Sequence, residues 1–118
     1  MSGDVFMDSG ALGTPAVVIH GGAGDFVRPR SEQDLGRLSQ GLSDALGAAW
    51  EVLSAGGHAL DAVIEAVARM EASGIFNCGR GAVATARGTV ETDAAVMDGA
   101  SGSFGAICAA TCRPTSNA

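Results

Sequence analysis

The sequence contains no tyrosine and no lysine, only one tryptophan and three prolines, and aromatic residues make up 4% of its 118 positions. A core built around aromatic rings is therefore excluded, and aliphatic and alanine side chains must fill it. All seven basic residues are arginines, which form no cluster and face 13 acidic residues, for a formal net charge of −6. Nothing in this pattern would neutralise phosphates, so we expect no nucleic-acid partner.

Long apolar runs are also missing. None approaches the roughly 20 residues that span a bilayer, so we expect no membrane association. Segment 1–14 has acidic residues where a signal peptide needs positive charge, and it lacks an apolar stretch. We expect it to be a flexible leader and the chain to be cytoplasmic. The three cysteines, Cys78, Cys108 and Cys112, are too few for a disulfide scaffold and lack the further ligand pair of a zinc site.

Glycine is abundant, with 18 residues, against a usual share of roughly 7%. This predicts tight turns and close approaches of backbone to backbone. Hydrophobic residues make up 47% and charged residues 17%, which is typical of a globular chain, and the length allows one domain.

The first half of the chain predicts one strand and two helices. TPAVVIH (14–20) is a continuous apolar run, typical of a buried strand, and stops at a glycine loop. Leucines recur at helical spacing over 32–54, after a capping-box-like start at Ser31 and Asp34. A second helix is predicted over about 58–72, with an apolar face formed by Leu60, Val63, Val67 and Met70.

The second half predicts antiparallel strands. Apolar and polar residues alternate in short runs over 82–86, 89–97 and 103–110, separated by Arg87-Gly88 and Asp98-Gly99 turns. The order β-α-α-β-β-β indicates an α+β fold with the helices on one side of a sheet.

HGGAG (20–24), at the end of the predicted strand, is the first candidate site. Glycines there could point backbone N–H groups into a cleft, as oxyanion holes and phosphate loops require. No Gly-Lys-Ser/Thr follows, which excludes the phosphate-loop pattern. A plain tight loop is an equal alternative, and His20 alone is more often structural than catalytic.

Side chains elsewhere offer weaker candidates. Cys78 with His20 would make a thiol–imidazole pair, although a packed cysteine is the commoner case. Glu91, Asp93 and Asp98 could imitate a carboxylate site, although solvated or turn-capping roles are favoured. Gly88-Thr89-Val90 has the neighbours of a threonine that becomes a nucleophile after self-cleavage. It lies in a predicted turn, however, with only 29 residues after it.

Taken together, three segments carry a specific resemblance: VVIHGGAG (17–24), GGHALDAVIEAVARMEASGIFNCGRGAV (56–83) and GTVETDAAVMDG (88–99). In this order the sequence resembles the plant-type L-asparaginase / isoaspartyl peptidase family of N-terminal nucleophile hydrolases. The resemblance implies a four-layer αββα sandwich, of which 15–110 would be a part. It also implies self-cleavage into α and β subunits assembled as (αβ)2. A threonine at the start of β would attack the amide of L-asparagine or the isopeptide bond of a β-aspartyl dipeptide.

The resemblance also assigns supporting residues. His20, Gly21, Gly22 and Gly24 would form a glycine-rich loop beside the nucleophile, and Asn77 would help hold the nucleophile region. The family has a cation-stabilised loop, and by this alignment backbone carbonyls would bind structural sodium; they belong to Met70, Glu71, Ser73, Phe76, Cys78 and Arg80. No other cofactor is implied.

Departures from the family matter as well. Its precursors are more than twice this length, and their nucleophile follows MDG in a Thr-Val-Gly context that this sequence lacks. Thr89 aligns with an internal threonine, Cys78 stands where alanine is usual, and 111–118 reads as a divergent or truncated tail. We therefore expect the N-terminal part of an α portion, without a catalytic nucleophile and dependent on the remainder of α and on β. The alternative is a non-catalytic remnant or a regulatory partner of a separate β-like chain.

Overall fold

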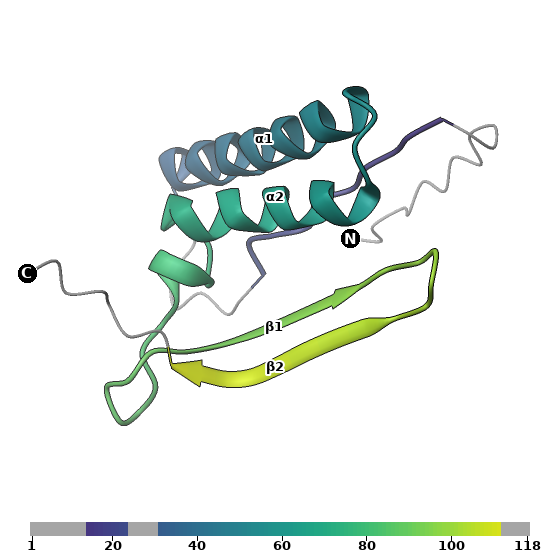
Figure 1. The fold of residues 1–118 in the computed structure, drawn as a ribbon. Helices are drawn as coiled ribbons and strands as arrows, with labels where there is room; N and C mark the ends of the chain where they lie inside the picture. The colour runs from purple at the N-terminus through teal and green to yellow at the C-terminus, as the bar shows by residue number, and fades with distance from the viewer. Residues whose placement is uncertain (1–13, 24–30, 112–118) are drawn as a thin grey trace, which may run out of the picture.

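The computed structural model describes residues 14–23 and 31–111, and this part of the chain is α+β. Two helices lie side by side, and a β-hairpin lies beneath the second of them (Figure 1). The elements are α1 (Glu32–Ser54), α2 (Ala59–Ser73), the short 3-10 turn η1 (Gly79–Gly81), β1 (Glu91–Met97) and β2 (Phe104–Thr111).

Helix α1 has the limits that the sequence predicts, because local interactions define both of its ends. Ser31 Oγ accepts a hydrogen bond from the Asp34 N–H at 3.1 Å, and the Ser31 N–H donates to Asp34 Oδ2 at 3.1 Å. At the other end Gly56 adopts a φ of 81°, and the Gly57 N–H donates to the Val52 carbonyl at 2.9 Å. The predicted capping box and glycine stop are both confirmed.

Alanine side chains form the contact between the two helices. Ala45 and Ala49 of α1 are 0% exposed, and Ala62 and Ala66 of α2 are 1% and 4% exposed. Their small side chains let the two helices pack closely. Both ends of helix α2 lie one residue later than predicted. The helix is terminated by Gly74, which adopts a left-handed conformation (φ 69°).

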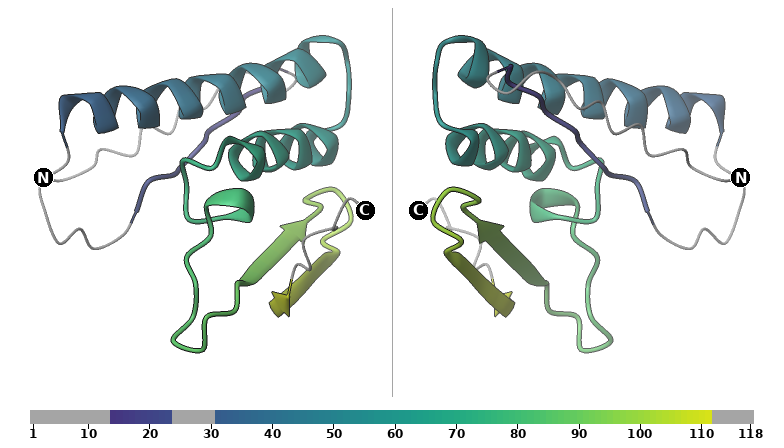
Figure 2. Two further views of the ribbon diagram at one scale, coloured as in Figure 1. Left: turned by 90° about the vertical axis from the view of Figure 1, so that its left-hand side faces the viewer. Right: turned by 90° about the vertical axis from the view of Figure 1, so that its right-hand side faces the viewer.

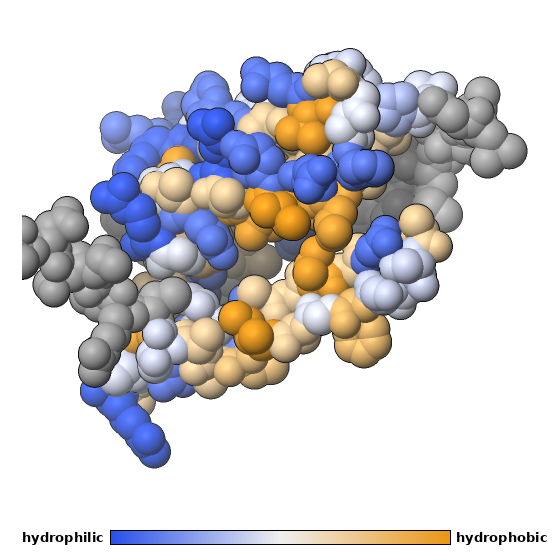
Figure 3. Space-filling view, in the orientation of Figure 1, coloured by the Kyte–Doolittle hydropathy of each residue, from blue (hydrophilic) through white to orange (hydrophobic). Residues whose placement is uncertain are grey.

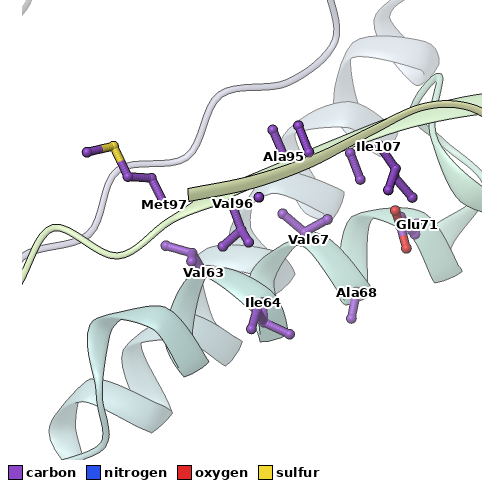
Figure 4. Close-up of a pocket in the computed structure, with 12 residues that line it drawn as sticks. Val63, Ile64, Val67, Ala68, Glu71, Ala95, Val96, Met97 and Ile107 are labelled. Carbon is purple, nitrogen blue, oxygen red and sulfur yellow. The ribbon is translucent and has the colours of Figure 1, made fainter. Parts of the chain in front are cut away.

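The valines of the predicted apolar face of α2 are not on the side of the helix that faces α1. Val63 and Val67 are 43% and 50% exposed, because Ala62 and Ala66 occupy the side that faces α1. The two valines point toward the hairpin instead (Figure 4).

Residues 14–23 form an extended segment that crosses the helix pair (Figure 1). Val17 and Ile19 pack against the alanine core, while Val18 between them is 91% exposed. The alternation is that of a strand, but the predicted strand 14–20 is wrong for the described residues. A strand needs a hydrogen-bonded neighbour, and neither β1 nor β2 pairs with this segment.

The predicted strand 82–86 is reduced to a single bridge between Ala84 and Val90. Two backbone N–H groups of this segment are bonded within the preceding loop instead of to a neighbouring strand. The N–H of Ala82 donates to the Gly79 carbonyl at 3.2 Å, and that of Val83 donates to Asn77 Oδ1 at 2.9 Å. These bonds replace the ladder that a third strand would need.

β1 and β2 pair antiparallel and form the hairpin, with its turn at Asp98–Ser103. The register shifts between Thr92 and Ala94, which marks a β-bulge. The helices lie on one side of the hairpin, as predicted (Figure 2). In the described residues the order is therefore α-α-β-β rather than β-α-α-β-β-β, and the four-layer sandwich stays a prediction.

Candidate functional site

The glycine-rich turn lies against the loop that follows α2. An alanine Cβ placed on Gly21 would lie 2.6 Å from Met70 Cε, 3.1 Å from Leu42 Cδ2 and 3.1 Å from Phe76 Cε1. The next residue, Gly22, adopts a φ of 84°, a conformation that favours glycine. Two predicted site segments, far apart in sequence, are therefore in contact.

His20 is exposed at the edge of the turn. Gly24 lies outside the described residues, so its predicted role stays a prediction.

Asn77 ties the two sides of the 74–83 loop together. Its Oδ1 accepts a hydrogen bond from the Val83 N–H at 2.9 Å. An asparagine that spans six residues in this way fixes the loop as a unit. We predicted from the resemblance that Asn77 supports the nucleophile region; the bond seen here gives it a local positioning role.

Two glycines bring backbone carbonyls together in the same loop. A Cβ on Gly79 would lie 2.5 Å from Glu71 Cβ and 2.7 Å from the Glu71 carbonyl oxygen. A Cβ on Gly81 would collide with the Phe76 carbonyl oxygen and lie 2.8 Å from that of Gly74. The Glu71 carbonyl oxygen therefore lies against Gly79, and those of Gly74 and Phe76 lie against Gly81, at places where any Cβ would collide.

The six carbonyls predicted to bind sodium are partly engaged in the fold. That of Met70 accepts from Ser73 Oγ at 2.7 Å, that of Phe76 from the Cys78 N–H at 2.8 Å, and that of Cys78 from the Gly81 N–H at 3.0 Å. Each carbonyl oxygen has a second lone pair, so these bonds leave room for a cation. Crowded neutral oxygens fit a hard, singly charged ion.

Sequence reasoning did not single out the Gly74 carbonyl, whose oxygen lies 2.8 Å from the position of a Cβ on Gly81. The signal that could have found it is the repeated glycine of CGRG, which indicates that another backbone approaches there. In the described part of the chain, no three His, Cys, Asp or Glu side chains gather as a metal site.

Cys78 does not have the surroundings of an activated thiol. Burial raises the pKa of the Cys78 thiol, and the nearby Glu71 carboxylate raises it further. A catalytic thiolate needs the opposite shift. No hydrogen bond joins Cys78 to His20, although both belong to the described residues, and His20 is not among the causes of the shift in the Cys78 pKa. The thiol–imidazole pair, which the sequence analysis disfavoured, is not formed.

The three candidate carboxylates serve the fold rather than a common site. Asp98 caps the hairpin turn, accepting from Ser101 Oγ at 2.6 Å and from the Ala100 N–H at 3.1 Å. The Ser101 hydroxyl chiefly, with the Ala100 N–H, lowers the pKa of Asp98. Asp93 Oδ1 accepts a hydrogen bond from the Ala109 N–H at the strand bulge, and Glu91 accepts one from Thr89 Oγ1 at 3.2 Å.

Thr89 closes the turn that was predicted at Arg87-Gly88. Its carbonyl accepts from the Thr85 N–H at 2.8 Å, and the two threonine hydroxyls lie 2.8 Å apart. Gly88 adopts a φ of 78°. These bonds give Thr89 a structural role.

An apolar groove of about 750 Å³ separates α2 from the hairpin. Val63 and Val67 point toward Val96 and Ile107 across it (Figure 4). The space-filling view shows apolar residues gathered along this seam, while polar residues predominate on the N-terminal half of α1 (Figure 3). All four of these side chains remain more than 40% exposed. Among the described helices, none is long and apolar enough to cross a membrane.

Most of this chain is similar in sequence to known proteins. The asparaginase family model matches residues 13–113. An isoaspartyl peptidase/L-asparaginase of Danio rerio is 45% identical over 95 residues, which are 80% of this chain and 29% of that protein. An isoaspartyl peptidase of Salmonella typhimurium is 47% identical over 77% of this chain and 29% of its own length. A plant-type L-asparaginase of Thermococcus kodakarensis is 44% identical over 78% of this chain and 29% of its own length.

The matching region contains the glycine turn at His20–Gly22, both helices, the segment 70–83 that carries the candidate carbonyl oxygens (the carbonyl loop), and the hairpin. The chain spans about 29% of the length of these relatives. On the family match and these identities, the chain belongs to the asparaginase family, as its motifs predict.

Proposed function

We propose that this chain supplies the glycine turn and the carbonyl loop of an enzyme that hydrolyses the side-chain amide of L-asparagine or the isopeptide bond of β-aspartyl dipeptides. The observation that carries the proposal is the contact of Gly21 with Met70 and Phe76. That contact joins the two segments to which the family resemblance assigns supporting roles.

In this proposal the nucleophile is a threonine outside these 118 residues, at the N-terminus of a β subunit. Its hydroxyl attacks the side-chain carbonyl, the amine or ammonia leaves, and water then releases aspartate from the acyl-enzyme. Thr89 is no substitute, because its carbonyl and hydroxyl are bonded within a turn. Cys78 is no substitute either, because its thiol has a raised pKa.

The carbonyl loop would hold a sodium ion through the oxygens named above. The fit rests on Gly79 and Gly81, against which carbonyl oxygens pack so closely that any Cβ would collide with them. The ion would fix the loop by cross-linking its oxygens. Asn77 would act in the same sense through its bond to Val83.

The exposed groove between α2 and the hairpin supports a dependence on further sequence. Apolar side chains that are half exposed on both sides of a groove are typical of an interface. We propose the remainder of α and the β subunit as the partners, in an (αβ)2 assembly.

The test is a chimaera in which this chain replaces the matching 29% of the Danio rerio relative. We expect self-cleavage and aspartate release from both L-asparagine and a β-aspartyl dipeptide, with no release by the 118-residue chain alone. A folded, dimeric chimaera without release would contradict the proposal and favour a non-catalytic role. Release by the isolated chain that Thr89→Ala or Cys78→Ala abolished would place the nucleophile inside it.

A further inference from the structure

The ring of Phe76 fills the space between the glycine turn and helix α1. Phe76 is 4% exposed, which makes it the largest side chain in the core of the described residues. On one side, Phe76 Cε1 lies 3.1 Å from the position of a Cβ on Gly21. On the other side, its Cε2 and Cζ lie 3.0 and 3.1 Å from that of a Cβ on Gly41.

At both glycines an added Cβ would meet neighbouring side chains, whereas the backbone conformation itself does not call for glycine. Neither Gly21 nor Gly41 has a positive φ, so an L residue could adopt either backbone. Gly41 is buried, whereas Gly36 and Gly47 in the same helix have no atom within 4 Å of a placed Cβ. A glycine inside a helix costs roughly 1 kcal/mol relative to alanine. Of these three glycines, only Gly41 would bring an added Cβ against the ring, and against Ile75 Cδ1 at 3.2 Å.

The backbone of Phe76 belongs to the carbonyl loop at the same time. Its carbonyl oxygen lies against Gly81 and accepts the Cys78 N–H at 2.8 Å. One residue thus contributes an oxygen to the loop and a ring to the underside of the turn.

From this geometry we propose that Phe76 is a positioning residue, whose ring sets the place of the His20–Gly22 turn relative to α1 and the carbonyl loop. The turn has no strand neighbour among the described residues, and the Phe76 ring packs against it at Gly21. Leu42 and Met70 close the contact on Gly21. The use of this device in catalysis rests on the proposed function; the packing itself does not.

The first test is spectroscopic and uses the 118-residue chain. A Gly21 α-proton points toward the place of the missing Cβ, which lies 2.6 Å from Met70 Cε and 3.1 Å from Cε1 of the Phe76 ring. Its NMR shift is expected to be displaced by the ring current, and Phe76→Leu is expected to abolish the displacement. An unchanged Gly21 shift in the variant would overturn the contact.

The second test is a double-mutant cycle read by amide hydrogen exchange at Gly21 and Gly22. Gly41→Ala should push the ring and speed exchange about tenfold, since each 1.4 kcal/mol of local stability is a factor of ten. In a Phe76→Leu background, which lacks Cε2 and Cζ, Gly41→Ala should add less than about a factor of two. Gly47→Ala is the matched control and should leave exchange unchanged.

Equal effects of Gly41→Ala in the two backgrounds would overturn the proposal, as would an equal effect of Gly47→Ala. If Gly41→Ala prevented folding altogether, rescue of folding by Phe76→Leu would support the proposal and failure of that rescue would contradict it.

Activity provides a separate readout. In the chimaera, Phe76→Leu should lower kcat more than it raises KM, because a displaced turn would misplace groups beside the nucleophile. A chimaera that is inactive with native Phe76, while the NMR and exchange results hold, would contradict the proposed function and leave the packing role intact.

Discussion

The N–H of Ala109 donates a hydrogen bond to Asp93 Oδ1 at 2.7 Å, across the hairpin and at its bulge. The bond gives one of the candidate acids a structural role. Asp93→Ala would leave the Ala109 donor without this acceptor, and we expect a loss of about 1 kcal/mol in the free energy of unfolding. Asp93→Asn keeps an oxygen and should lose less. Urea unfolding of the chain measures both, and equal losses would contradict the assignment.

Ala109 has a φ of 51°, a left-handed conformation that L residues rarely adopt. That conformation costs about 1–2 kcal/mol, whereas glycine loses about 0.5–1 kcal/mol more conformational entropy on folding. We therefore expect Ala109→Gly to stabilise the chain by about 0.5–1 kcal/mol in urea unfolding. Ala106→Gly, in the same strand but without a positive φ, is the control and should destabilise. A lower free energy of unfolding in both variants would contradict backbone strain at Ala109.

The sequence predicted best what local interactions determine. The limits of α1 follow from the Ser31–Asp34 capping box and from Gly56, all within a few residues of the helix. The strand 14–20 failed because pairing is a long-range property. Its alternation survives in Val17 and Ile19, but no described strand lies beside it.

The candidate site shows the same division. The motifs around His20 and Asn77 placed the chain in its family, which the comparisons confirm. The packing of Phe76 between Gly21 and Gly41 could not be predicted, because these glycines are far from Phe76 in sequence and look like ordinary flexible positions. Only the three-dimensional contact separates a glycine needed for space from one that is not.

Cys78 should react slowly with alkylating agents at neutral pH. Burial chiefly, and Glu71 next, raise the pKa of its thiol, so the thiolate becomes abundant only at a pH above the ordinary range. In a Cys108→Ser, Cys112→Ser background, the rate of reaction with iodoacetamide can be measured as a function of pH. For a cysteine peptide, with a pKa of about 8.5, this rate levels off above that pH, whereas the rate for Cys78 should still be rising there. Glu71→Gln should move the inflection to lower pH. An inflection below that of the peptide would restore Cys78 as a candidate nucleophile.

Asp98 should make hairpin stability depend on acid pH. The Ser101 hydroxyl is the largest cause of its lowered pKa. Because the folded pKa lies below the unfolded value of about 3.9, the stabilisation is fully present above that value and is lost as pH falls through the folded pKa. Carboxyl NMR titration should show the low pKa, and Ser101→Ala should raise it. Ser39→Ala in α1 is the control; equal shifts in both variants would contradict the turn-cap assignment.

Sodium should stabilise the chain through the carbonyl loop, and Gly81 gives the sharpest test. Sodium chloride at tenfold the dissociation constant of the ion should add about 1.4 kcal/mol to the free energy of unfolding, which raises Tm by about 5 °C or more for a domain of this size. Choline chloride at equal ionic strength should not raise Tm. A Cβ at Gly81 would collide with the Phe76 carbonyl oxygen, so Gly81→Ala should abolish the difference between the two salts. Gly99→Ala, with open space around its Cβ and no positive φ, should preserve it. The same Tm in both salts for the unaltered chain would remove sodium from the proposal, and a sodium effect that survived Gly81→Ala would place the ion elsewhere.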